Sequence, residues 1–282
     1  MKNQMNLNVT LMAAAVASAS MATAAHGAVA SFGGTGANAA GLTPSVDNFR
    51  TAVGGPVNAP GSGPFATGRR EINWDAGALD AFASPSLMPN NFFNNNSKRG
   101  ATFVTAGDGF LVSQRTGQAG FTSLRFGDID ASYPAEFAAF SNDRLFAARN
   151  STVTDVFFFV PSSPTTPATV SSFGAIFADV DSDSDTFVQF FDLGGVLLHT
   201  VFASPLDKGL SFAGARFDAG ERIARVRITS GNTFMAPGVL DGGANDIVVM
   251  DDFIYSEPIE VPAPGTAAAL AGLALAGFRR RR

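Results

Sequence analysis

The stretch that decides the fold is residues 186–202, which read TFVQFFDLGGVLLHTVF. Two runs rich in β-branched and aromatic residues, 186–191 and 196–202, flank the tetrapeptide DLGG at 192–195. An aspartate followed by two glycines between such runs is a strong short-range signal for a β-hairpin. The sequence therefore predicts two antiparallel strands joined by a tight turn.

Similar strand signals recur on both sides of this hairpin, with turn residues between them. The other predicted strands are residues 101–104, 109–113, 153–160, 170–180, 210–217, 221–230 and 247–255. In the run 221–230, apolar Ala224, Val226 and Ile228 alternate with a largely polar face, which is the period of a half-buried strand. Residues 161–167, with prolines at both ends, predict a loop. Because no long amphipathic helix separates the runs, we expect an all-β fold, an antiparallel β-sandwich of jelly-roll-like topology.

Composition divides the chain of 282 residues into four parts. Residues 1–27 combine Lys2, an apolar alanine-rich run and small residues near the end, as a signal peptide does. Residues 28–68 are rich in Gly, Ala, Pro, Ser and Asn, and predict an irregular lead-in. The β-sandwich is expected at 69–258, and residues 259–282 form a distinct C-terminal segment.

The charge balance excludes one class of partner. The chain carries 19 basic and 24 acidic residues, a formal net charge of −5. Without Lys2 and the four terminal arginines, 14 basic residues remain against 24 acidic ones, a balance of −10. Such a surface repels phosphate backbones and attracts cations, so no nucleic-acid partner is expected. The chain has no cysteine, so an exported form must be held by core burial, with metal ions as an additional aid.

The densest acidic run lies at 179–185, where every second residue is an aspartate. Its members are Asp179, Asp181, Asp183 and Asp185. Carboxylates this close repel one another unless a cation or solvent screens them, and calcium prefers such oxygen ligands. The run lacks the glycine and glutamate of an EF-hand loop. It predicts a structural calcium site, and the alternative is a solvated acidic turn between two strands.

A second acidic feature is the pair Asp251 and Asp252 inside the predicted strand 247–255. Strand alternation places the two on opposite faces, so one of them needs a partner in the interior or at an edge. This stretch resembles the closing strand of carbohydrate-binding jelly-roll modules, in which an aspartate often ligates a structural calcium. The resemblance implies that Asp251 or Asp252 is a calcium ligand. A salt bridge to Arg225 or Arg227 on a neighbouring strand is the equal alternative.

Three amphipathic aromatic residues, Trp74, Tyr133 and Tyr255, suit a sugar-stacking platform, and core packing is the competing interpretation. A glycan-active enzyme, a hydrolase or lyase, would need a pair of acids. The available carboxylates Glu71, Asp75, Glu136 and Glu221 show no spacing that identifies such a pair.

The sequence offers few residues suited to nucleophilic catalysis or zinc binding. Apart from His26 in the signal segment, His199 is the only histidine. There is no cysteine, and no Gly-x-Ser-x-Gly elbow accompanies the histidine. A site with several histidines around zinc is therefore excluded by count, and the sequence predicts a non-catalytic protein.

The C-terminal segment combines three features. The motif Pro262-Ala263-Pro264 precedes an apolar stretch to residue 278, and four arginines follow, Arg279, Arg280, Arg281 and Arg282. In this order the features resemble a PEP-CTERM sorting signal, with Ala in the place of the central Glu. The 14 residues 265–278 would span about 21 Å as a helix, short of a bilayer core of roughly 30 Å. A short, removable transmembrane sorting helix fits this length better than a permanent anchor, although a plain membrane tether is the alternative.

The resemblance implies a place for the protein in the cell. Members of this family, in Gram-negative bacteria, are exported, tethered transiently to the inner membrane and processed by exosortase, a membrane protease. They then associate with exopolysaccharide or the cell surface. The region from 69 to 258 resembles the uncharacterised β-rich domains that accompany the signal. We therefore expect a non-catalytic surface or extracellular-matrix protein, with structural calcium as the one candidate cofactor. The alternatives are a glycan-active enzyme and a structural adhesion protein with a protein partner.

Overall fold

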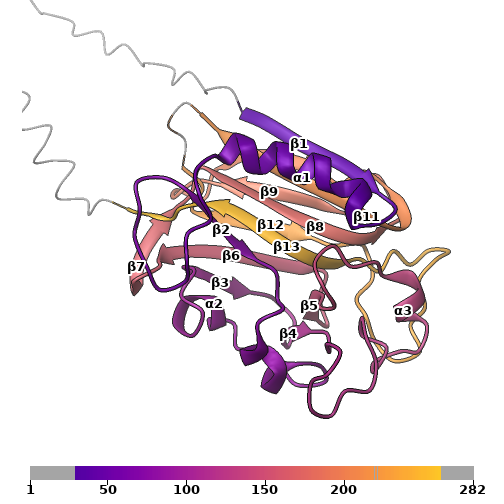
Figure 1. Cartoon of the computed structure of the whole chain (residues 1–282). Helices are drawn as coiled ribbons and strands as arrows, with labels where there is room; N and C mark the ends of the chain where they lie inside the picture. Colours follow the sequence, from indigo (N-terminus) through magenta and orange to yellow (C-terminus); the bar gives the residue numbers. More distant parts are fainter. Residues whose placement is uncertain (1–28, 219, 221, 262–282) are drawn as a thin grey trace, which may run out of the picture.

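The computed structural model describes residues 29–218, 220 and 222–261, which fold into two antiparallel seven-stranded sheets (Figure 1). Sheet A contains β1 (Val29–Gly36), β2 (Arg69–Ile72), β4 (Gly109–Val112), β5 (Phe146–Arg149), β8 (Ser172–Val180), β11 (Leu206–Phe217) and β13 (Val249–Ser256). Sheet B contains β3 (Ala101–Val104), β6 (Val153–Val160), β7 (Ser163–Thr169), β9 (Phe187–Phe191), β10 (Leu197–Phe202), β12 (Arg225–Thr229) and β14 (Ile259–Glu260). The helices are α1 (Ala39–Val53), η1 (a 3₁₀-helix, Gly77–Phe82), α2 (Phe92–Asn95) and α3 (Tyr133–Glu136).

The strand order is β1-β11-β8-β13-β5-β4 in sheet A, with β2 also paired to β13. In sheet B the order is β10-β9-β12-β6-β7-β14, with β3 also paired to β6. The predicted hairpin is confirmed as β9 and β10, and its turn is closed by the Val196 amide donating to Asp192 Oδ1 at 2.8 Å. The all-β, antiparallel prediction is therefore confirmed.

The two sheets share one apolar core. Phe158 of β6 contacts Phe173 of β8 and Tyr255 of β13, with ring centroids 6.3 and 5.4 Å apart. Phe190 of β9 meets Phe217 of β11 in the same way at 5.7 Å. Because such edge-to-face and tilted aromatic contacts join residues of opposite sheets, the sheets pack face to face as in a sandwich.

Helix α1 covers the outer face of sheet A above β1 and β11 (Figure 1). Leu42, Val46 and Phe49 lie on one side of this helix and are fully buried, as the helical period requires. The helix begins after Asn38, whose side chain accepts the Gly41 amide at 3.0 Å. A Cβ atom on Gly36 of β1 would lie 2.3 Å from the Leu42 nitrogen, so only glycine allows this close contact.

This arrangement differs from the irregular lead-in that composition predicts for residues 28–68. Residues 29–36 form an edge strand, and 39–53 form a helix. Two of the glycines that suggested an irregular segment, Gly34 and Gly36, allow the close approach of helix to strand. Residues 163–169 likewise form β7, although their prolines predict a loop. Proline cannot donate a hydrogen bond to a neighbouring strand, but β7 uses only part of its backbone to pair with β6 and β14.

Some predictions lie outside the described residues. These include the signal peptide at 1–27, the motif Pro262 to Pro264, the apolar stretch to 278 and the four terminal arginines. In the part of the chain that the structure describes, no helix has the length and apolar character needed to cross a membrane.

Candidate metal centre

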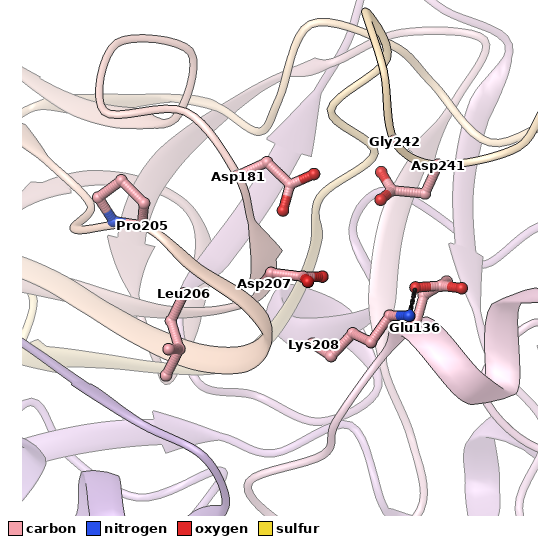
Figure 2. Close-up of a pocket in the computed structure, with 8 residues that line it drawn as sticks. All are labelled: Glu136, Asp181, Pro205, Leu206, Asp207, Lys208, Asp241 and Gly242. Carbon is pink, nitrogen blue, oxygen red and sulfur yellow. Dashed lines mark ion pairs between the residues drawn. The ribbon is translucent and has the colours of Figure 1, made fainter.

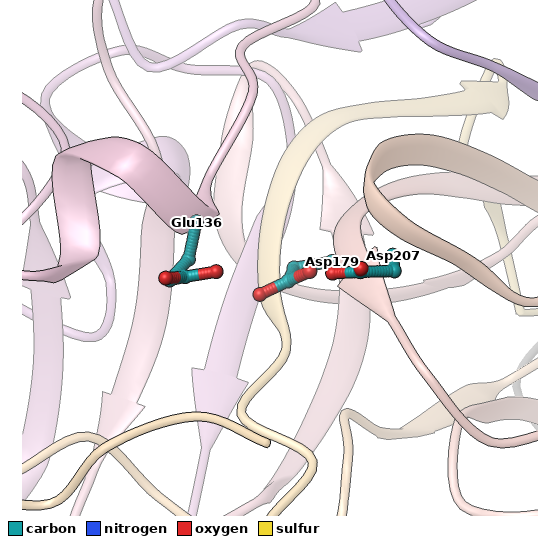
Figure 3. A group of neighbouring side chains, drawn as sticks. All are labelled: Glu136, Asp179 and Asp207. Atoms are coloured by element: carbon teal, nitrogen blue, oxygen red, sulfur yellow. The ribbon is translucent and has the colours of Figure 1, made fainter.

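Five carboxylates from distant parts of the chain gather at one end of β8 (Figures 2 and 3). We call this group the acidic cluster; its members are Glu136, Asp179, Asp181, Asp207 and Asp241. The cluster adjoins an open cavity of about 440 Å³, which is lined by Glu136, Asp181, Pro205, Leu206, Asp207, Lys208, Asp241 and Gly242. The cavity therefore presents carboxylates from α3, from the segment after β8, from β11 and from the loop before β13.

The local backbone explains how these groups meet. The pairing of β11 with β8 shifts between Leu206 and Leu210, which bulges the intervening residues out of the ladder. The bulge contains Asp207 and Lys208, and Lys208 has a positive φ of 55°. Asp179, at the end of β8, also has a positive φ of 68°. Backbone strain of this kind persists only where the surroundings enforce it and is typical of functional sites.

Asp179 lies at the centre of the acidic cluster and is fully buried. Its Oδ1 accepts the Lys208 backbone amide at 2.7 Å, whereas its buried Oδ2 has no hydrogen-bond partner. Burial is the largest cause that raises the pKa of Asp179, to about 7, and Asp181 and Asp241 add to the effect. A buried carboxylate with a free oxygen is costly unless a proton or a cation satisfies it.

The acidic cluster contains two overlapping triads. The first triad is Asp179, Asp181 and Asp241; the second triad is Glu136, Asp179 and Asp207. In each triad one oxygen atom of every residue lies within 4.8 Å of the others. Three oxygens this close can share one ion after small rotations of the side chains, because calcium–oxygen distances in proteins are 2.3–2.6 Å. The carboxylate-only ligand set suits a hard cation rather than zinc or copper.

The structure brings together only part of the predicted aspartate run. Asp179 and Asp181 belong to the acidic cluster, but Asp183 is exposed in a turn and Asp185 accepts the Asn232 side-chain amide at 3.0 Å. Of the four aspartates predicted as calcium ligands, only Asp179 and Asp181 therefore belong to a group with cation spacing among the described residues. Strand alternation stops after β8 because residues 183–185 form a turn, so the later carboxylates point elsewhere.

Sequence reasoning missed three members of the acidic cluster: Glu136, Asp207 and Asp241. Each comes from a segment more than 25 residues from Asp179, so no local pattern joins them. A usable signal was the Asp207-Lys208-Gly209 insertion just before the predicted strand at 210–217. Such an interruption of a strand is typical of a bulge, and bulges often carry functional groups.

Asp251 and Asp252 occupy the middle of β13 and are both buried. A register shift between Met250 and Phe253 interrupts the alternation, so the two side chains do not lie on opposite faces. The Ser141 hydroxyl lies 3.1 Å from Asp251 Oδ1 and 2.6 Å from Asp252 Oδ1. The prediction of opposite faces is therefore wrong, and the β-bulge is the reason.

The arginines predicted as partners of this pair bind another carboxylate. Among the described residues, the carboxylate triads with cation spacing do not include Asp251 or Asp252. Arg225 and Arg227 instead bind Asp155 of β6, at 3.0 and 2.7 Å. Those two arginines lie on sheet B, so the predicted salt bridge to Asp251 or Asp252 in sheet A is wrong.

The Asp251–Asp252 pair shares its protons. Burial raises the pKa of Asp251 well above the ordinary range and that of Asp252 to about 6. The one hydroxyl proton of Ser141 cannot serve both carboxylates, so a protonated carboxyl supplies the remaining hydrogen bond. The charged groups that face Asp252 are Arg50 of α1, at 4.0 Å, and Glu71 of β2.

This pair predicts a pH dependence of stability. Because the folded-state pKa of Asp252 is raised, the folded protein retains a proton that the unfolded chain loses between about pH 4 and pH 6. Stability is therefore expected to fall as pH rises through this window, by on the order of 2 kcal/mol. Asp252→Asn, which remains neutral, should show a smaller fall. Urea unfolding at pH 4.5 and 7.5 measures the difference, and equal falls in both proteins would contradict the shared proton.

The three aromatic residues predicted as a sugar platform all lie in the interior, so that prediction is wrong. Trp74 stacks on Phe146 at 4.0 Å and donates from Nε1 to the Asp251 carbonyl at 2.8 Å. The hydroxyls of Tyr133 and Tyr255 donate to backbone carbonyls at 2.8 and 3.0 Å. Core packing, the competing interpretation, describes all three.

Of the carboxylates considered for catalysis, Glu136 belongs to the acidic cluster, and Asp75 Oδ2 lies 3.4 Å from the Ser141 hydroxyl. His199 is half-buried, and its Nε2 lies 2.8 Å from the Ser31 hydroxyl. Glu71 pairs with Arg50 and Arg69, at 2.9 and 2.6 Å. Glu221 lies outside the described residues. Comparison of the chain with family models, curated proteins and solved structures finds no match to any of them.

Proposed function

We propose that this chain is an exported, non-catalytic protein of the cell surface or extracellular matrix whose β-sandwich binds calcium and associates with exopolysaccharide. One observation carries the calcium part of the proposal: fully buried Asp179 has an unpartnered oxygen at the centre of the acidic cluster. Calcium at the first triad, with Asp181 and Asp241, supplies the missing partner. The jelly-roll-like topology of the antiparallel sandwich is part of this proposal.

The chemistry favours calcium over other common ions. Zinc prefers nitrogen and sulfur ligands, and the acidic cluster offers only oxygen. Magnesium demands a small, near-octahedral shell and usually keeps several waters. Calcium accepts carboxylates in irregular geometry, and the open cavity beside the triad leaves room for water or a ligand to complete its shell.

The location is argued from the ends of the sequence. The alanine-rich N-terminus predicts export, and the C-terminal motif resembles a PEP-CTERM signal that exosortase processes at the inner membrane. Matrix polysaccharides rich in hydroxyl and carboxylate groups can coordinate a calcium ion that has open positions. Mass spectrometry of the mature protein tests the processing step, because a C-terminus ending at Arg282 would contradict it.

The calcium part predicts a thermal shift. Calcium at about 100 times its dissociation constant is expected to raise the melting temperature of the purified chain by about 5–10 °C relative to chelator. Asp179→Asn, Asp181→Asn and Asp241→Asn should each remove most of this shift. The same samples, mixed with matrix polysaccharide and centrifuged, should carry protein into the pellet in calcium and leave it in the supernatant in chelator.

Asp183→Asn is the matched control, because it removes the same charge from the same run outside the acidic cluster. It should keep the full calcium shift. An unchanged melting temperature in chelator would refute the calcium site. A calcium shift without sedimentation would reject the polysaccharide part and favour an adhesion role with a protein partner.

A further inference from the structure

We propose that the acidic cluster is a two-cation centre, in which the second triad binds a second calcium and Lys208 acts as a tethered competitor for that place. This inference rests on the proposed calcium function and extends it. The two ions would share Asp179, which belongs to both triads. Glu136 and Asp207 complete the second place on the α3 and β11 side of Asp179 (Figure 3).

The geometry of the second triad matches that of the first. Its three carboxylates approach within 4.8 Å of one another, the same limit that the first triad satisfies. Figure 3 shows the Asp179 carboxylate between those of Glu136 and Asp207. Asp179 is fully buried, its Oδ2 has no partner and its Oδ1 accepts only the Lys208 amide, so the carboxylate has acceptor capacity for two ions.

The charge balance of the acidic cluster also favours more than one divalent ion. Five carboxylates surround one ammonium group, that of Lys208. With all five ionised the charge is −4, so one calcium leaves −2 and two leave zero. Like charges at this spacing repel one another strongly in a partly buried site. Two calcium ions therefore neutralise the cluster, and one does not.

The Lys208 ammonium group lies beside Glu136, a ligand that the second cation would also use. Its Nζ lies 3.2 Å from Glu136 Oε2 (Figure 2), and its side chain is 55% exposed. A long, half-exposed lysine can rotate into solvent at little cost. The backbone amide of Lys208 still holds Asp179 Oδ1, so the side chain can leave Glu136 without releasing the loop. The ammonium then competes with calcium for Glu136 by charge alone.

Calcium stoichiometry tests this arrangement. Isothermal titration of the chelator-stripped, purified chain with calcium is expected to give two ions per chain. Asp207→Asn, at an exposed position, should leave one ion, and Asp181→Asn should also leave one. Asp179→Asn should lose both, and the control Asp183→Asn should keep two. Lys208→Gln should tighten the weaker site by about fivefold or more, since it removes a like charge near the incoming ion.

The outcomes separate this inference from the function on which it rests. Two ions in the wild type, falling to one in Asp207→Asn, support the two-cation centre. One ion in both proteins would overturn the second site and leave the proposed calcium function intact. No binding in the wild type would refute the calcium function itself. Far-UV circular dichroism of each variant verifies that a lost ion does not reflect a lost fold.

Discussion

Replacing Glu257 by alanine is expected to lower the free energy of unfolding by about 3–5 kcal/mol, because it leaves the buried Arg70 guanidinium unpaired. Glu257 Oε2 accepts Arg70 Nε at 2.6 Å, and Oε1 accepts Nη2 at 2.7 Å. Both side chains are buried. Glu257 also accepts the Asn58 side-chain amide and the Phe65 backbone amide, so it ties the segment 54–68 to the end of β13.

Two further variants make the test of this ion pair specific. Urea unfolding of Arg70→Met combined with Glu257→Leu should show a smaller loss than Glu257→Ala alone, because the double variant buries no unpaired charge. Asp218→Ala breaks the exposed pair with Arg216 and should change stability by less than about 1 kcal/mol. A loss below about 1 kcal/mol in Glu257→Ala would show that the pair contributes no more than a surface pair.

The second large effect is expected at Trp74, whose replacement by alanine should cost about 3–5 kcal/mol. The indole is buried and stacked on Phe146, with Phe93 and Phe253 edge-on at 5.3 and 5.1 Å. Removing it opens a cavity at the centre of the aromatic core between the sheets, which rigid neighbours cannot refill. Its Nε1 hydrogen bond to Asp251 would also be lost.

Trp74→Phe tests how much of this cost an aromatic ring at the same position recovers. It retains a stacked ring but loses the Nε1 donor and part of the indole volume, so the expected cost is about 1–3 kcal/mol. Unfolding is followed by circular dichroism, because Trp74 is the only tryptophan and fluorescence disappears with it. A cost for Trp74→Ala no larger than that for Trp74→Phe would mean that the ring does not fill the core.

Most of the strands were predictable because each is a local pattern. The runs at 101–104, 153–160 and 186–202 lie in β3, β6 and the β9–β10 hairpin. Their alternation or apolar composition is visible within a few residues. The edge strand β1 was missed because four of its eight residues, including its last, are glycine or alanine, and propensity gives such a segment no preference for a strand.

Only those members of the acidic cluster that lie close together in the sequence were predictable. Asp179 and Asp181 are separated by one residue, and their spacing indicated a cation. The carboxylates of Glu136, Asp207 and Asp241 reach the same point through strand pairing and a bulge. The order of residues along the chain does not show that these carboxylates meet, because the register of β11 on β8 depends on contacts made across the sheet.

The sequence alone determined the class of fold and the acidic character of the chain, because composition and short-range periodicity are properties of neighbouring residues. The tertiary structure decided which acids face one another and which aromatic residues are buried. Trp74, Tyr133 and Tyr255 are buried in the core and cannot contribute to a surface site. Asp251 and Asp252 lie close together because a bulge interrupts the alternation of β13. Those outcomes depend on long-range packing, in which the burial of one side chain is set by residues far away in the chain.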